Sequence, residues 1–246
     1  MTFEEIFTID TSNMYSLIKK FPDQVEEAIK IGSTAKAKLN VGSIENITLC
    51  GLGGSAIGGD LLKSYLAGEI SVPFLVNRNY TLPKFVGKKS LVIISSYSGN
   101  TEETTTAFKE AVKRRAKILC ISSGGAVAKI AKKRRIPLIT IPGGLPPRAA
   151  LGYSFFPLLI TLSKLGFIKT KSREINEALA RWTPEPALES RAGVLPAPVA
   201  QRPVPVGAFG AGPARRLPYF AVHGERASGV YVAHAAIPPR IGFLFP

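Results

Sequence analysis

The sequence predicts an α/β fold built on a doubly wound parallel sheet. Five short apolar runs alternate with amphipathic helical segments between residues 46 and 165, which is the pattern of parallel strands covered by helices on both faces. Two of the runs end in turns rich in glycine and hydroxyl residues. Apolar residues make up 46% of the chain, enough for a substantial core.

Two amphipathic helices precede the sheet, over Ser12–Lys20 and Pro22–Ile31, and Pro22 suits the first turn of a helix. The expected strands are Asn46–Gly51, Val72–Asn77, Ser90–Ser95, Lys117–Ser122 and Pro137–Ile141. Further helices are expected from the first glycine-rich turn to Leu66, over Thr101–Arg115, Ala126–Arg135 and Leu151–Leu165.

The composition changes near residue 171. Residues 1–170 contain 17 lysines and 6 arginines, whereas residues 171–246 contain 1 lysine, 8 arginines and 11 of the 19 prolines. Helical periodicity reappears only near Glu174–Arg181, and the later prolines interrupt any long helix or central strand. We therefore expect N-terminal helices over 1–34, one domain over 35–170 and an atypical segment over 171–246. That segment is interpreted as an extended arm, or as a truncated or frameshifted second subdomain; sequencing the gene across codons 165–185 tests the frameshift.

The formal net charge of +15 lies in short basic runs without interleaved aromatic residues. The runs Lys113–Arg115 and Lys132–Arg135 fall at the ends of predicted helices, where cations suit the helix dipole. A solvated face that attracts anionic metabolites explains them better than nucleic-acid binding does. We expect no nucleic-acid partner.

Neither a signal peptide nor a membrane span is expected. Residues Met1–Asp10 are acidic and polar, and the most apolar stretch, Ala149–Ile168, contains Pro157 and a lysine. Cys50 and Cys120 both fall in apolar strand-like runs, so core thiols are favoured over a disulfide or a metal pair. These features predict a cytoplasmic protein.

Two strand–turn–helix junctions share one construction. The first reads GLGGSAIGGD, with turn residues Gly53, Gly54 and Ser55; the second reads SYSGNTEET, with hydroxyls from Ser96, Ser98 and Thr101. Ligands of parallel sheets collect at the carboxyl ends of strands, where these turns lie. Free helix amides and hydroxyls hydrogen-bond phosphate oxygens. Because the turns lack the lysine of nucleotide-binding loops, a sugar monophosphate is favoured over a nucleoside triphosphate.

Two other interpretations of these turns stay open. Asn100 and Glu103 fit a helix capping box, although this leaves the hydroxyl set unexplained. The run Gly51–Ala56 also fits a G-x-G-x-x-A dinucleotide fingerprint, but Asn77 and Arg78 stand where the second strand should supply an acid. Arg78 would suit a 2′-phosphate, so an NADP-dependent reductase remains an alternative.

A third motif, PPRAALGY, follows the last strand and places Arg148 just before a helix at the same sheet edge. An arginine there suits an anionic enediolate or a sugar oxygen. A surface arginine after a Pro-Pro turn is an equally good interpretation of this residue alone.

In this order and spacing, the three motifs resemble the bifunctional phosphoglucose/phosphomannose isomerases, whose chains carry two sugar isomerase (SIS) subdomains. The resemblance covers about residues 10–170. It implies a SIS-type sheet and a cofactor-free, metal-free homodimer that interconverts glucose 6-phosphate or mannose 6-phosphate with fructose 6-phosphate through an enediol. It further implies a catalytic Arg148 near the reacting carbons and substrate phosphate binding by Gly53, Gly54, Ser55, Ser96, Ser98 and Thr101.

The chain departs from that family in its last part. The family's glutamate base, in a stretch like N-E-N-x-K, and its ring-opening histidine, in an H-N-E segment, have no match here. The chain's histidines, His223 and His234, stand in A-V-H-G-E and V-A-H-A-A and are interpreted as incidental. We therefore expect impaired turnover, and a non-catalytic SIS module that binds or senses sugar phosphates is the alternative.

Overall fold

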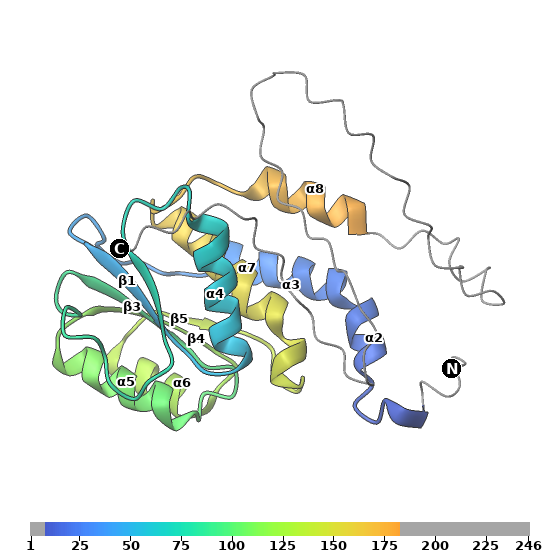
Figure 1. Cartoon of the computed structure of the whole chain (residues 1–246), viewed down its shortest axis with the longest axis horizontal. Helices are drawn as coiled ribbons and strands as arrows, with labels where there is room; N and C mark the ends of the chain where they lie inside the picture. The colour runs from blue at the N-terminus through green and yellow to red at the C-terminus, as the bar shows by residue number, and fades with distance from the viewer. Residues whose placement is uncertain (1–7, 183–246) are drawn as a thin grey trace, which may run out of the picture. The chain divides into compact units, whose positions relative to one another are not determined.

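The structure is a computed structural model that describes residues 8–182. In chain order the elements are α2 (Met14–Lys19), α3 (Phe21–Thr34), β1 (Asn46–Cys50), α4 (Gly54–Leu66), β2 (Phe74–Asn77), β3 (Ser90–Ser95), α5 (Glu102–Lys113), β4 (Lys117–Ser122), α6 (Gly125–Arg134), β5 (Leu138–Thr140), the 3₁₀ turn η1 (Pro147–Ala149), α7 (Leu151–Lys164) and α8 (Ser172–Trp182). Figure 1 shows their arrangement.

The five strands form one fully parallel sheet in the order β2-β1-β3-β4-β5. This order is one of the two common doubly wound arrangements, and the direction of winding reverses between β1 and β3. Helices α3, α4 and α7 cover one face, while α5 and α6 cover the other (Figure 1). The α/β fold class and the doubly wound sheet expected from the sequence are therefore confirmed.

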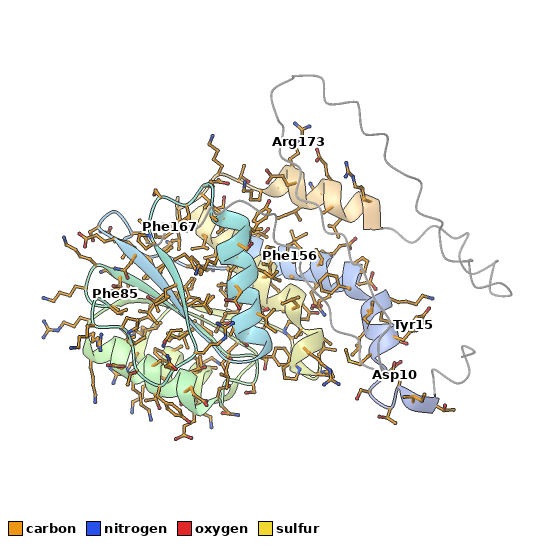
Figure 2. All side chains as sticks on the ribbon, in the orientation of Figure 1. Asp10, Tyr15, Phe85, Phe156, Phe167 and Arg173 are labelled. Carbon is orange, nitrogen blue, oxygen red and sulfur yellow. The ribbon has the colours of Figure 1, made fainter. Side chains whose placement is uncertain are left out.

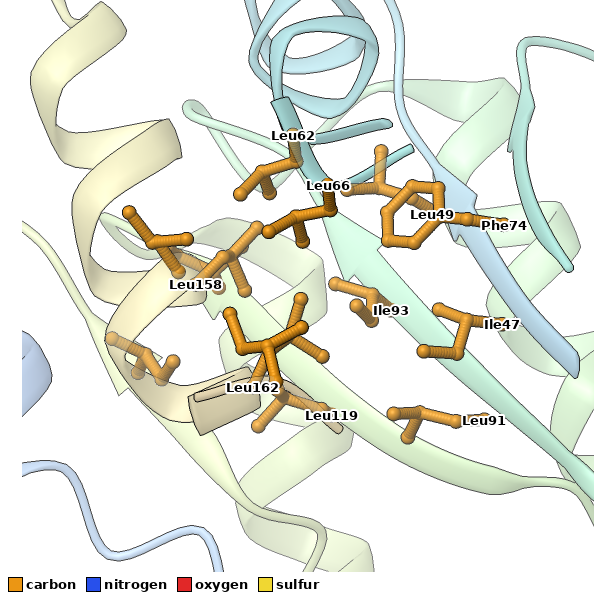
Figure 3. Packing of buried hydrophobic residues seen from close by; sticks show 14 of the residues in the cluster. Ile47, Leu49, Leu62, Leu66, Phe74, Leu91, Ile93, Leu119, Leu158 and Leu162 are labelled. Carbon is orange, nitrogen blue, oxygen red and sulfur yellow. The ribbon is translucent and has the colours of Figure 1, made fainter. Parts of the chain in front are cut away.

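Alternation along the strands divides the apolar residues between two cores. Because successive side chains point to opposite faces, odd-numbered residues such as Leu49, Ile93 and Leu119 pack with Leu62 and Leu158 of α4 and α7 (Figure 3). Even-numbered residues of β1, β3 and β4 pack instead under α5 and α6, in a cluster that contains Val92, Ile94, Cys120, Phe108 and Val127.

Both cysteines are core thiols, as expected. Cys50 and Cys120 are free and buried on the α5–α6 side of the sheet. Burial raises the pKa of each thiol to about 12, which keeps both in the neutral, unreactive form.

The predicted element boundaries differ from the observed ones mainly at the sheet edges. Edge strand β2 begins at Phe74 rather than Val72, since Pro73 has no amide hydrogen for the ladder. Edge strand β5 is limited to Leu138–Thr140 and pairs on one side only. At the first helix, the Asp10 carboxylate accepts hydrogen bonds from the amides of Met14 and Tyr15, which stabilises the start of α2.

Helix α8 lies within the segment 171–246 that the sequence marks as atypical. Its Ile175 is 6% exposed and belongs to the main core, and Glu174 accepts a hydrogen bond from Tyr65 of α4 at 3.4 Å. On its outer side, Arg173 points into solvent and pairs with Glu177 (Figure 2). None of the helices in the described part combines the length and apolar character needed to cross a membrane.

Candidate functional site

The three motifs lie at the carboxyl edge of the sheet, where β1 and β3 end side by side. The register pairs Cys50 of β1 with Ile94 of β3, so the turns that follow these strands leave the sheet as neighbours. From there α4 crosses one face of the sheet and α5 the other. In open parallel sheets this reversal point leaves a crevice in which ligands bind.

The first two turns touch each other directly. The amide of Tyr97 donates a hydrogen bond to Ser55 Oγ at 3.1 Å, and Ser55 is 7% exposed. A serine hydroxyl has one donor and two acceptor positions, so this bond leaves the Ser55 hydrogen available to donate. This contact places the two turns next to each other at the sheet edge.

The hydroxyls of the second turn form a local network. Ser96 Oγ accepts a hydrogen bond from the Gly99 amide at 3.1 Å and lies 3.0 Å from Thr101 Oγ1. One of these two hydroxyls donates to the other, which leaves one hydrogen for a ligand. Ser98 is exposed, and its Oγ accepts from the Asn100 amide at 3.3 Å. The network fixes the turn before any ligand arrives.

The Arg148 turn packs against the first of these turns. A Cβ atom on Gly54 would lie 2.7 Å from the carbonyl oxygen of Pro147 and 3.6 Å from the amide nitrogen of Arg148. Only glycine permits this approach without a shift. Arg148 is exposed, and no ion pair or side-chain hydrogen bond engages it within residues 8–182. The guanidinium is therefore available to an anion.

The field at this edge favours anions at one helix more than at the other. The first turn of α4 contains no acidic residue, so its amides present the uncompensated positive end of the helix dipole. The first turn of α5 carries Glu102 and Glu103, which offset that field. Desolvation is the largest cause that raises the pKa of Tyr80, and the nearby Glu102 and Glu103 carboxylates raise it further.

A third turn, not singled out from the sequence, completes this edge. Ser123, after β4, donates to the Tyr97 carbonyl oxygen through its amide at 3.0 Å and through Oγ at 2.6 Å. Gly99 has a φ of 72°, and a Cβ there would lie 1.9 Å from the Gly124 carbonyl oxygen. The SSGG run at 122–125 has the same strand–turn–helix construction as the other two, so the same argument would have found it.

The capping-box interpretation does not describe the second turn. Thr101, not Asn100, is the N-cap of α5, and it makes no side-chain cap hydrogen bond. Asn100 instead accepts from the Ala126 amide at the start of α6, at 3.0 Å. The asparagine therefore joins two turns rather than closing one helix.

The dinucleotide interpretation depends on two residues that the fold engages in other contacts. Asn77 is 5% exposed, and its side-chain Nδ2 donates to the backbone carbonyl oxygens of Asn79 and Thr81, at 3.1 and 3.2 Å. Arg78 forms an ion pair with Asp60 of α4. Neither side chain is thus held ready for a ribose hydroxyl or a 2′-phosphate.

A dense group of basic residues lies away from these turns. Residues 109–135 contain ten lysines and arginines but one acid, Glu110, which pairs with Arg114. A hollow of about 400 Å³ between α5 and α6 is lined by Lys109, Val112, Lys113, Ile130, Lys133 and Arg134. These residues lie toward the C-terminal ends of the two helices, away from the turns.

The two histidines of the chain, interpreted from the sequence as incidental, fall outside the described residues. His223 and His234 lie beyond residue 182, so the part of the chain that the structure describes contains no histidine. Within it, no group of three or more histidine, cysteine, aspartate or glutamate side chains is placed to hold a metal ion.

Comparison with known proteins shows which family the chain resembles. No family model matches the chain. It is 45% identical over 166 residues to a bifunctional phosphoglucose/phosphomannose isomerase of Caldicellulosiruptor bescii, an alignment that covers 68% of this chain and 49% of the relative. It is 34% identical over 154 residues to a D-glucosamine-6-phosphate 4-epimerase of Sulfolobus acidocaldarius, covering 62% and 46%. This chain thus spans about half the length of the curated relatives it matches.

Solved structures agree on the fold. A candidate phosphosugar isomerase of Clostridium difficile 630 superimposes with a TM-score of 0.53 at 18% identity, covering 67% of this chain and 49% of that one. The likeness extends the sequence match to the arrangement of sheet and helices. Over about two thirds of its length, the chain is therefore a homologue of the bifunctional phosphoglucose/phosphomannose isomerases, with a domain of the SIS type.

Proposed function

We propose that the turns after β1 and β3 bind the phosphate of a hexose 6-phosphate, and that the chain serves aldose–ketose isomerisation of glucose 6-phosphate or mannose 6-phosphate to fructose 6-phosphate. The observation that carries the proposal is the contact between Ser55 Oγ and the Tyr97 amide, with the Arg148 turn packed on Gly54. Together these two contacts bring to one sheet edge a helix start, hydroxyl hydrogens that remain available to donate, and a guanidinium that has no ion pair among residues 8–182.

The phosphate would lie at the start of α4, where the dipole is not opposed by an acid. Donors there are the amides of Gly54 and Ser55, the hydroxyls of Ser55 and Ser98, and one hydrogen of the Ser96–Thr101 pair. A fixed site gains more from such donors because little ordering remains to be done on binding. Gly53, with φ of 53°, shapes the turn that presents them.

Arg148 would act at the other end of the sugar. The isomerisation moves a proton between C1 and C2 and places negative charge on the enediolate oxygens. An arginine beside those oxygens stabilises the charge as it develops. The proton itself needs a general base, whose removal typically costs about 10²–10⁴ in rate. The residues that match the family's motifs supply binding and charge stabilisation, and turnover is therefore expected to be slow.

Binding is better supported than any single reaction. The two relatives are named for different chemistry, an isomerisation and a 4-epimerisation, yet both names imply a hexose or hexosamine phosphate substrate. A non-catalytic SIS module that binds or senses sugar phosphates is thus the second candidate. A coupled isomerase assay separates the two: turnover that Arg148→Ala abolishes supports the enzyme, and binding without turnover supports the module.

Calorimetry tests the phosphate site. Wild-type protein should bind fructose 6-phosphate and 5-phosphoarabinonate, and Ser98→Ala should weaken both. Ser98 is exposed and bonded only within its turn, so the substitution should leave the melting temperature unchanged. Ser33→Ala, an exposed serine in α3, is the matched control. Absence of phosphate-dependent binding in wild type, or unchanged binding in Ser98→Ala, contradicts the proposal.

We further propose that the chain works as a homodimer in the cytoplasm. Two exposed apolar side chains beside the site, Leu52 and Ile57 at 41% and 50% exposure, would gain from a partner surface. Sedimentation at micromolar concentration measures the state of association directly.

A further inference from the structure

Gln24 of α3 bonds the backbone on the α7 side of Arg148. It is 7% exposed and uses both ends of its amide: Nε2 donates to the Ala149 carbonyl oxygen, and Oε1 accepts from the Gly152 amide, each at 2.8 Å. The Gly152 amide lies in the first turn of α7, where helix amides have no partner within their own helix. One side chain therefore fixes the end of η1 and the start of α7.

Gln24 packs tightly against the start of α7. A Cβ atom on Gly152 would lie 2.6 Å from Gln24 Oε1, so the glutamine occupies the space that a larger residue would fill. On the opposite side, the Pro147 carbonyl rests on Gly54. The Arg148 backbone is thus held between α4 and α3. These contacts fix the point on the backbone from which the Arg148 side chain leaves the domain, and that side chain has no ion pair or hydrogen bond of its own within residues 8–182.

We infer that Gln24 is a positioning residue for Arg148, and that it tunes recognition of the anionic, enediolate-like end of the substrate rather than of its phosphate. The inference rests on the proposed function. It predicts a selective effect, because both side-chain hydrogen bonds of Gln24 within residues 8–182 go to the segment that flanks Arg148 and neither goes to the turns at Ser55 and Ser98.

The same helix pair offers a matched control. Lys164, at the far end of α7, donates to the carbonyl oxygens of Gly32, Ser33 and Ala35 at the end of α3. Lys164→Met removes polar α3–α7 bonds about 20 Å from the Arg148 turn, given the length of α7. A purely structural role for Gln24 would make Gln24→Met behave like this control.

The test uses full-length protein and two ligands that share the phosphate. One is 5-phosphoarabinonate, whose carboxylate occupies the place of the enediolate; the other is arabinitol 5-phosphate, which is uncharged at that end. Gln24→Met should weaken 5-phosphoarabinonate about tenfold, because a hydrogen bond to a charged group is misaligned, and should leave arabinitol 5-phosphate unchanged. Lys164→Met should leave both affinities unchanged.

A double variant completes the test. In an Arg148→Ala background, Gln24→Met should cause no further loss, since residues that act through one another are not additive. Equal loss for both ligands, or an additive loss in the double variant, overturns the inference. If Gln24→Met does not fold, Gln24→Glu, which keeps the acceptor for Gly152, gives the same comparison. If wild type binds neither ligand, the proposed function fails first, and the inference fails with it.

Discussion

Gly54→Ala provides a direct test of how the Arg148 turn is seated. The new Cβ would lie 2.7 Å from the Pro147 carbonyl oxygen and 3.2 Å from its carbon. Both are backbone atoms, so no side-chain rotation relieves the overlap. Reaching even 3.0 Å requires the two segments to separate by 0.3 Å, and an ordinary contact of 3.4 Å requires 0.7 Å.

The cost follows from two opposing effects. Overpacking of this kind costs about 1–3 kcal/mol, while alanine regains about 0.5–1 kcal/mol over glycine in a helix. The centres of these two ranges leave a net loss of about 1 kcal/mol, which lowers the melting temperature by about 2–4 °C in a protein of this size. The displaced Arg148 should also weaken 5-phosphoarabinonate binding.

Differential scanning calorimetry of the full chain measures this loss. Gly68→Ala is the control: a Cβ there meets no atom within 4 Å, so that variant should match or slightly exceed wild type. If Gly54→Ala melts at or above the Gly68→Ala temperature, the seating of the Arg148 turn on α4 is not as described.

Three further predictions concern other parts of the domain. Thr48 Oγ1 is buried without a hydrogen-bond partner in the described residues. Thr48→Val should therefore raise the free energy of unfolding, measured in urea, by about 1 kcal/mol. A lower free energy of unfolding in the variant would contradict this prediction. The amide of Leu82 is the main cause that lowers the pKa of Glu110, so its carboxylate stabilises the fold above the unfolded pKa near 4.5. Glu110→Gln should therefore cost stability at pH 7, and the difference from wild type should shrink as pH falls below 4.5; a constant difference would contradict this sign. Tyr97→Phe removes the hydroxyl that accepts a hydrogen bond from the Leu145 amide at 2.9 Å. The free energy of unfolding should fall by about 1 kcal/mol in the same urea assay. An unchanged urea midpoint would show that this bond contributes nothing to stability.

Local patterns in the sequence were sufficient to predict the helices and strands and to propose a kind of site. Apolar runs such as Ser90–Ser95 and Lys117–Ser122 are buried strands with the predicted bounds, because a strand covered on both faces has to be apolar along its whole length. Glycines and hydroxyls after β1 and β3 indicated the turns that we propose bind phosphate, since few other residues suit a close anion. The local motif PPRAALGY likewise singled out Arg148 as a candidate site residue.

Only the tertiary structure decided which of these pieces meet. The order β2-β1-β3-β4-β5 brings the turns after β1, β3 and β4 to one edge, and no local signal encodes strand order. The two Gln24 bonds span 125 and 128 residues, so they depend on how α3 packs against α7. The sequence around a single buried glutamine in an amphipathic helix does not predict its hydrogen-bond partner. For Gln24 that partner is a backbone segment far along the chain, which only the folded structure brings near.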